Sequence, residues 1–158
     1  MNIKITYNWL LEYLDTDAGP YEMQKYLSLC GPSIESVEKV GDDYVFDIEI
    51  TSNRIDTASV IGIAREAQAI LPMFGKKAVL KSNPLELLRL DQVKTGSGYD
   101  LKVEIKNPDL VSRFTAIIFD QIVIGHSPEY IGKRLKLAGV KVINNVVDIS
   151  NYLMITLG

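Results

Sequence analysis

The chain has 158 residues, of which 47% are hydrophobic and 23% are charged. This balance is typical of a folded globular protein and excludes a disordered chain, and the length suffices for one ordinary domain or two small ones. The apolar runs are too short to cross a bilayer, and the N-terminus does not resemble a signal peptide. Cys30 is the only cysteine, which excludes an internal disulfide. We therefore expect a cytoplasmic protein with no membrane partner.

The net charge of −3 is unevenly distributed along the chain. Residues 1–75 carry 5 basic and 12 acidic groups, a balance of −7, whereas residues 76–158 carry 12 basic and 8 acidic groups, a balance of +4. The acidic half should not bind a polyphosphate on its own. A balance of +4 in the second half is only weak support for a nucleic-acid partner.

The first 31 residues predict a short strand and two helices. Residues 3–5 read as the strand, and Thr6 can cap a helix that runs from Tyr7 to Leu14 with one apolar face. Pro20 suits the first turn of a second helix, which Gly31-Pro32 should end.

A hairpin and a third helix are expected next. Strands at about 34–40 and 44–51 are separated by Gly41-Asp42-Asp43, a sequence typical of a hairpin turn. The helix after Asp56 should end at Pro72 and Gly75. Its expected buried residues are Val60, Ile63, Ala64, Ala67 and Leu71.

The predicted fold class is α+β, with three parts. Residues 1–75 form a small module of helix, helix, hairpin and helix, and residues 76–98 form a linker containing proline and glycine. Residues 99–158 read as the truncated start of a second, α/β domain. Its expected elements are strands at about 101–105 and 113–124, a helix from Ser127-Pro128 to Ala138, and a last segment at 144–157 whose apolar residues lack an obvious partner.

The polar turn Asn53, Arg54 and Asp56 is the strongest candidate for a functional site. A structural interpretation accounts for all three residues: Asp56 caps the helix that follows, Asn53 closes an Asx-type turn, and Arg54 pairs with a nearby acid. The functional alternative is an exposed arginine at a protein or RNA interface. The structural interpretation is favoured.

The sequence provides no catalytic, cofactor-binding or metal-binding set of residues. Asp47 and Glu49 share one strand face and could, with the acidic turn 42–43, hold a hard cation, but a solvated strand face is the favoured explanation. His126 is the only histidine; without cysteines or other histidines it cannot build a zinc site, and no set of base and nucleophile exists around it. Whether the chain is an enzyme stays open at this point.

Four stretches of the chain resemble one family. They are ITYNWLLEYLD at 5–15, LCGPSIESVE at 29–38, FDIEITSNRIDTASVIGIARE at 46–66 and NPDLVSRFTAIIFDQIVIGHSPEYIGKRLKLAGVKVINNVVDISNYLMITLG at 107–158. The first three resemble the N-terminal domain of the bacterial phenylalanyl-tRNA synthetase beta subunit. The fourth is similar to the start of that subunit's editing domain, of the B3/B4 type. The stretches occur in the order of the family.

The departures from the family pattern are specific. Bacterial relatives usually insert an OB-fold tRNA-binding domain between the two hairpin strands, whereas this chain joins them directly through residues 40–43. The family usually has proline and cysteine where this chain has Ser52, Ile55 and Thr57. The sequence also ends before the family's histidine-containing editing segment.

The resemblance implies a part of the ligase that charges tRNA with phenylalanine, inactive alone, in which residues 1–75 serve as a scaffold. ATP and magnesium are expected only in the complete enzyme, and the implied partners are the alpha subunit, the remainder of the beta subunit, and tRNA. The alternative is a freestanding RNA- or protein-binding module derived from such a subunit. The apolar residues near the end of the chain favour the fragment.

Overall fold

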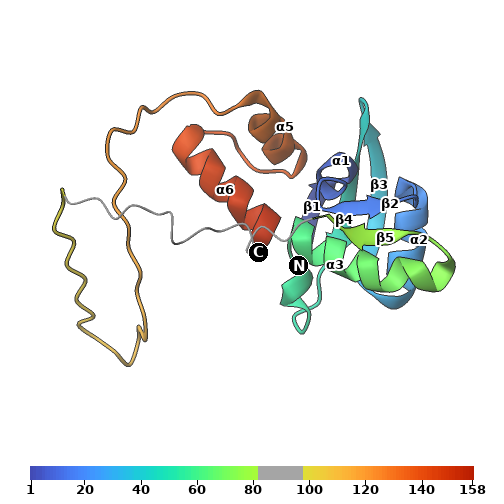
Figure 1. Ribbon diagram of the computed structural model, residues 1–158, viewed down its shortest axis with the longest axis horizontal. Helices are drawn as coiled ribbons and strands as arrows, with labels where there is room; N and C mark the ends of the chain where they lie inside the picture. The colour runs from blue at the N-terminus through green and yellow to red at the C-terminus, as the bar shows by residue number, and fades with distance from the viewer. Residues whose placement is uncertain (82–97) are drawn as a thin grey trace. The chain divides into compact units, whose positions relative to one another are not determined.

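The computed structural model describes residues 1–81 and 98–158 (Figure 1). In chain order its elements are β1 (Asn2–Thr6), α1 (Tyr7–Leu10), β2 (Leu14–Thr16), α2 (Pro20–Cys30), β3 (Ser33–Val40), β4 (Asp43–Glu49), the 3-10 helix η1 (Ile55–Thr57), α3 (Val60–Ile70), the 3-10 helix η2 (Leu71–Phe74), β5 (Ala78–Leu80), α5 (Glu129–Leu137) and α6 (Asn145–Leu157). Helices combined with small antiparallel sheets confirm the predicted α+β class. The finer order of helix, helix, hairpin and helix is not confirmed, because short strands flank the first helical turn.

The central sheet has three antiparallel strands in the order β1-β4-β3. Phe46 of β4 lies opposite Ile5 of β1 on one side and opposite Val37 of β3 on the other. The hairpin β3–β4 turns tightly at Gly41, whose positive φ of 60° favours glycine. The two strands therefore pair from Val40 and Asp43 onward, with no domain between them.

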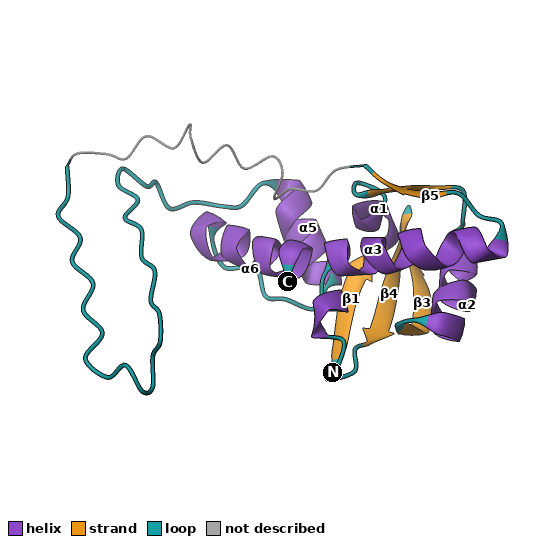
Figure 2. Ribbon diagram, turned by 60° about the horizontal axis from the view of Figure 1, so that its bottom comes forward, coloured by secondary structure: helices purple, strands orange, loops and turns teal. Residues whose placement is uncertain are grey.

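One face of this sheet forms the hydrophobic core. Phe46, Ile48 and Ile50 are buried, as their alternation predicts, and they join side chains from α1, α2 and α3 in a single cluster. Figure 2 shows α3 in front of the three strands. The five apolar residues expected on the buried face of the third helix are indeed buried.

The first helix is shorter than predicted. α1 ends at Leu10 instead of Leu14, although Thr6 caps it as expected, its Oγ1 accepting a hydrogen bond from the Trp9 amide at 3.2 Å. Leu14 instead begins β2, which pairs with β5. Pairing with a strand more than 60 residues away therefore determines the conformation at Leu14, although the local apolar spacing predicts a helix there.

The strands predicted at 101–105 and 113–124 are wrong: among residues 98–128, none is in a strand. Their alternating apolar side chains, including Val103, Ile117 and Phe119, are exposed. Extended backbone becomes a sheet only when a neighbouring strand accepts and donates its hydrogen bonds, and the described parts of the chain offer these segments none. The helix expected at 127–138 is present as α5, and the last segment is α6.

By their contacts, the described residues divide into two units, 1–81 with 124–158, and 98–123. Within the first unit α5 and α6 pack on each other, and Tyr152 and Ile155 of α6 lie against the hydrophobic core. The division into residues 1–75, 76–98 and 99–158 stays a prediction.

Candidate functional site

The polar turn between β4 and α3 is held by hydrogen bonds among its own residues. The Arg54 amide donates to the Thr51 carbonyl at 3.0 Å, and the Thr57 amide donates to the Arg54 carbonyl at 3.0 Å. The Thr57 hydroxyl also donates to the Arg54 carbonyl, at 2.7 Å, and Thr57 is only 2% exposed. These bonds close the turn onto η1 without any ligand.

Arg54 joins the turn to the helix that follows. Its Nε and Nη2 donate to the two carboxylate oxygens of Asp56 at 3.1 Å each, and Nη2 also reaches Oε1 of Glu66 on α3 at 2.5 Å. The hydrogen bonds from Arg54 hold the pKa of Asp56 below its ordinary value, and the hydrogen bonds to Asp56 and then to Glu66 raise the pKa of Arg54. The expected pairing of Arg54 with a nearby acid is therefore present.

The predicted role of Asp56 as helix cap is wrong. Asp56 lies in η1, and its carboxylate is occupied by Arg54. The cap is Ser59, which is buried and whose Oγ accepts from the Gly62 amide at 3.0 Å. The chain makes one turn of 3-10 helix before α3 begins, and this extra turn moves the cap three residues along the chain.

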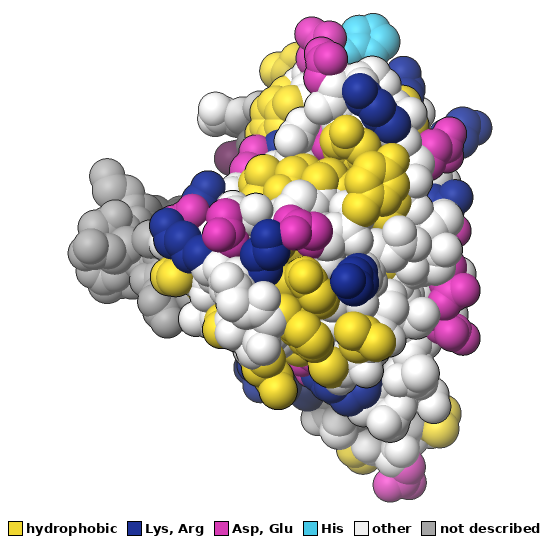
Figure 3. Space-filling model, turned by 90° about the vertical axis from the view of Figure 1, so that its right-hand side faces the viewer, with side chains coloured by type: hydrophobic (Ala, Val, Ile, Leu, Met, Phe, Trp, Pro, Cys, Tyr) yellow, Lys and Arg dark blue, Asp and Glu magenta, His cyan; other side chains and the backbone are white. Residues whose placement is uncertain are grey.

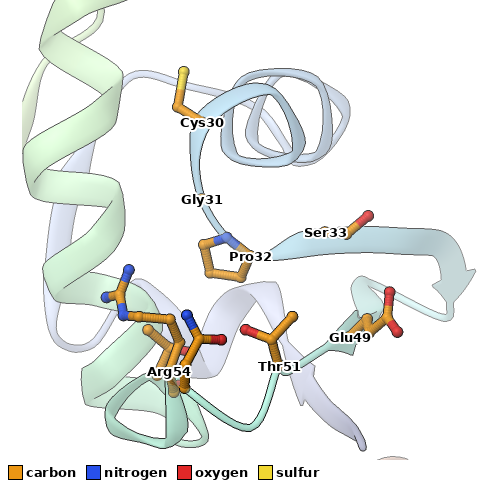
Figure 4. Close-up of a pocket in the computed structure, with 9 residues that line it drawn as sticks. Cys30, Gly31, Pro32, Ser33, Glu49, Thr51 and Arg54 are labelled. Carbon is orange, nitrogen blue, oxygen red and sulfur yellow. The ribbon is translucent and has the colours of Figure 1, made fainter.

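Asn53 is one of the residues that line a pocket beside the turn. Figure 4 shows this pocket between Cys30–Ser33 on one side and Glu49, Thr51 and Arg54 on the other. The pocket measures about 320 Å³ and is bounded by the end of α2, the start of β3 and the end of β4. Its polar lining comprises Ser33, Glu49, Thr51, Asn53, Arg54 and Thr57. In the described chain no hydrogen bond from the Asn53 side chain closes an Asx turn, so the turn depends on the backbone and Thr57 instead.

This pocket can form hydrogen bonds, and its lining includes one carboxylate, Glu49, and one thiol, Cys30. Cys30 lies at its rim, but no histidine lines the pocket to activate the thiol. Asn53 and Arg54 are thus brought to one place, whereas Asp56 is turned toward Arg54 and does not line the pocket.

The acidic residues of the hairpin are not brought together. Asp43 is buried, and its Oδ1 accepts from the amides of Asn8 and Tyr44 at 2.9 and 2.8 Å. Asp47 is engaged by Asn2 at 2.9 Å and by Lys4 at 3.7 Å, while Glu49 lies exposed at the pocket. In residues 1–81 and 98–158, no three acidic, histidine or cysteine side chains are grouped so that they could hold a metal ion.

The sequence did not point to a cluster around Arg134 of α5. Its guanidinium binds Glu12 of the turn after α1 and the hydroxyl of Tyr152, and Trp9 lies beneath it. In the sequence Arg134 lies between lysines on a basic helix, a pattern that is typical of solvent-exposed side chains. Because Glu12 and Arg134 are 122 residues apart, no local sequence pattern predicts their contact.

His126 is exposed in a loop, as predicted.

Charge on the surface is mixed. On the face shown in Figure 3, lysine and arginine side chains lie next to aspartate and glutamate side chains instead of gathering in one basic area. A phosphate backbone is bound by grouped positive charge, so this face does not have the character of a nucleic-acid platform. Over the part of the chain that the structure describes, no helix is long and apolar enough to cross a membrane.

Comparison with known proteins identifies phenylalanine–tRNA ligase beta subunits among the relatives of this chain. The family model of the B3/4 domain matches residues 110–158. The chain is 35% identical to the phenylalanine–tRNA ligase beta subunit of Rhodopirellula baltica over 156 residues, which is 98% of this chain and 21% of that protein. It is 34% identical to the same subunit of Carboxydothermus hydrogenoformans over 129 residues, 80% of this chain and 15% of that protein. No solved structure matches the chain.

The chain thus spans about a fifth or less of the length of these relatives. The match to the Rhodopirellula protein is nearly continuous, because its 156 aligned positions cover 98% of a chain of 158 residues. An inserted domain of ordinary size in that relative, anywhere within the matched residues, would have made the alignment much longer. A direct connection between the two hairpin strands is therefore shared with at least this relative.

Proposed function

We propose that the chain is the N-terminal part of a phenylalanine–tRNA ligase beta subunit, contributes to the assembly of such a ligase and is not catalytic alone, because it is related over almost its whole length to the beta subunit of Rhodopirellula baltica. The observation that supports this most directly is the match to 98% of the chain. Residues 1–75 serve as a scaffolding module, residues 76–98 as a linker, and residues 99–158 as the beginning of the editing domain. Its partners are then the alpha subunit, the remainder of the beta subunit and, in the complete enzyme, tRNA.

The geometry around Arg54 is consistent with a scaffold. The polar turn fixes the angle between β4 and α3 through bonds within the chain, and no histidine lines the neighbouring pocket to activate the Cys30 thiol. We place the chemistry elsewhere in the enzyme: ATP and magnesium bind outside this chain, in the cytoplasm, where tRNA charging takes place. The missing OB-fold domain is, on this proposal, a property of the lineage, supported by the continuous match to the Rhodopirellula subunit.

The assembly role is tested in the complete beta subunit that contains this sequence. The subunit with residues 1–81 removed is compared with the intact subunit for co-purification with a tagged alpha subunit and for charging of phenylalanine tRNA. We expect the deletion to reduce both in parallel. Undiminished co-purification with full charging would contradict the proposal.

A second measurement separates a scaffold from a freestanding RNA-binding module. The isolated chain should bind tRNA weakly and lose that binding as salt is raised, because mixed charge offers only screened attraction. It should also leave tyrosine-charged phenylalanine tRNA intact. Tight, tRNA-selective binding in a filter assay at physiological salt, or deacylation that vanishes in a His126→Ala variant, would favour the other function.

A further inference from the structure

Arg134 makes the most extensive set of polar and aromatic contacts between α5–α6 and the N-terminal module. Its Nη1 lies 3.0 Å from Oε2 of Glu12, Nη2 contacts Oε1 of the same carboxylate, and Nη1 donates to the Tyr152 hydroxyl at 2.7 Å. The guanidinium also lies 5.4 Å from the centre of the Trp9 ring system and 5.7 Å from that of Tyr130. The Arg134 side chain is only 16% exposed.

Trp9 forms the floor of this contact. It is fully buried, and Tyr152 of α6 stacks on it with ring centres 4.7 Å apart and ring planes at 15°. Trp9 therefore contacts both Arg134 of α5 and Tyr152 of α6, and Ile155 of α6 packs on the same core. Two helices from the second half of the chain meet one aromatic side chain of the first half.

The contact is made by side chains. Arg134 and Glu12 form hydrogen bonds between residues 124–158 and residues 1–81, and no strand pairing links these two described segments. The module itself is held by a continuous three-stranded sheet and its core. Such an arrangement allows α5–α6 to leave the module without breaking the sheet.

We infer that α5–α6 is a separable arm that docks on the N-terminal module, and that Trp9 and Glu12 form the receptor that recognises the Arg134 guanidinium. An arginine suits this receptor because its planar group binds one carboxylate through two nitrogens while its face lies against aromatic rings. A lysine has a compact charge that cannot do both. Arg, Trp and Tyr side chains at the centre of an interface commonly carry most of its binding energy.

The charge of Arg134 persists under ordinary conditions. Partial burial would lower its pKa, but the hydrogen bond to Glu12 and the neighbouring Tyr152 oxygen outweigh this, so the pKa is raised overall. The docking contact therefore keeps its cation near neutral pH. It is weakened by salt only in part, because Glu12 is half exposed whereas Arg134 is mostly covered.

Trp9 offers a direct test, because it is the only tryptophan of the chain and is fully covered when the arm is docked. Acrylamide quenching of its fluorescence is measured in the full chain and in Arg134→Lys, Glu12→Gln and the double variant. Loss of the two-nitrogen contact should shift the docking equilibrium by about tenfold toward the free arm, which makes Trp9 more accessible to quencher. Lys133→Ala, an exposed neighbour on α5, is the matched control and should quench like the parent chain.

NMR spectra of the backbone amides of β1 and β4 show whether the sheet stays folded when the quenching of Trp9 changes. Increased quenching with these strands intact, and a double variant no worse than Arg134→Lys, is the expected result. Unchanged quenching in both single variants would overturn the inference, as would loss of the β1 and β4 signals in both, because the arm would then not be separable. Quenching that depends on protein concentration would mean docking on a second copy and would also overturn it. None of these outcomes depends on whether the assembly role in the ligase is correct.

Discussion

Arg54 is the residue that holds the polar turn to α3. Its guanidinium contacts Asp56 within the turn and Glu66 one and a half turns into the helix, so a single side chain joins two elements. The Glu66 side chain is 19% exposed and has Arg54 as its ionic partner in the described chain. Asp56, in contrast, is largely exposed.

Arg54→Ala is therefore expected to destabilise the fold more than Asp56→Ala. Removing Arg54 leaves Glu66 partly buried without its partner, whereas removing Asp56 leaves the Arg54–Glu66 pair in place. Urea denaturation of the two variants at neutral pH measures the order. If Asp56→Ala shows the lower midpoint, the pair with Glu66 does not stabilise the turn.

Ser59→Ala should lower the free energy of unfolding by about 0.5–2 kcal/mol, because an N-terminal cap is lost. The Ser59 hydroxyl is buried and binds the Gly62 amide, which would be left without an acceptor. Ser150→Ala, on the exposed side of α6, is the control and should change the midpoint little. Equal stability of both variants in urea would show that Ser59 is not an effective cap.

The sequence indicated the chemistry of this turn better than its geometry. An arginine beside several acids predicts an ion pair, and that prediction is confirmed. Asp56 and Ser59 are both good caps three residues apart, and only the formation of η1 decides between them. The pocket beside Asn53 could not be predicted, because it is bounded by α2, β3 and β4 and no local pattern encodes their meeting.

At the scale of elements, α3 starts where it does because Gly62 lets η1 fold back on it. A Cβ at Gly62 would lie 2.4 Å from the Asp56 carbonyl oxygen and 2.7 Å from the Thr57 Cα, both backbone atoms that cannot move aside cheaply. The close approach of these two backbone segments therefore requires a glycine.

Gly62→Ala should destabilise the chain by about 1–3 kcal/mol through this overlap. The same substitution at Gly132 of α5 meets only the Val142 side chain at 3.8 Å, and there the gain in helix propensity should leave stability unchanged or raised by up to about 1 kcal/mol. Thermal or urea unfolding measures the stability of both variants, which carry the same glycine-to-alanine change at two sites. A neutral Gly62→Ala would mean that η1 can shift away from α3.

Elements defined by local signals were predicted, and elements defined by distant partners were not. α2, α3 and the β3–β4 hairpin have their caps, breakers and periodicity within a few residues, and all are present. β2 and β5 pair across more than 60 residues, and neither strand has a local signal. The prediction therefore assigned Leu14 of β2 to the first helix and all of β5 to the linker. At 101–105 and 113–124 the alternation is real, but alternation alone does not supply a partner strand.

On the scale of the whole molecule, the two units differ in how their backbone is protected. β5 is tied to the first unit by pairing with β2, and Lys76 binds Glu22 at 2.6 Å. Residues 98–123 are exposed and have neither helix nor strand. Proteases cut where backbone is exposed and unpaired.

Limited trypsin treatment should therefore cut at Lys102, Lys106 and Arg113 before it cuts at Lys25, Lys39 or Lys76. The first three are exposed in unpaired backbone, while the others lie in or beside elements of the first unit. Mass spectrometry of early fragments identifies the order. Early cleavage at Lys39, in the hairpin, would contradict the described sheet.

Acid should weaken the first unit through three carboxylates that join separate segments. Hydrogen bonds from Lys77, Lys76 and Arg54 lower the pKa values of Asp15, Glu22 and Asp56, respectively. Because these folded-state pKa values lie below the unfolded ones, the pairs contribute stability above the unfolded values, near 4, and lose it as the pH falls through the folded values.

The urea midpoint should consequently be level between pH 7 and pH 5 and fall as the pH is lowered from about 4.5 to 2.5. All three pairs are at least partly exposed, so added salt should lower the midpoint modestly at pH 7 and have less effect in acid, as the carboxylates become protonated. Asp15→Asn, which removes the ion pair between β2 and Lys77 without changing the size of the side chain, should make the acid transition shallower. A midpoint that rises on acidification would show that these carboxylates are not stabilised in the folded state.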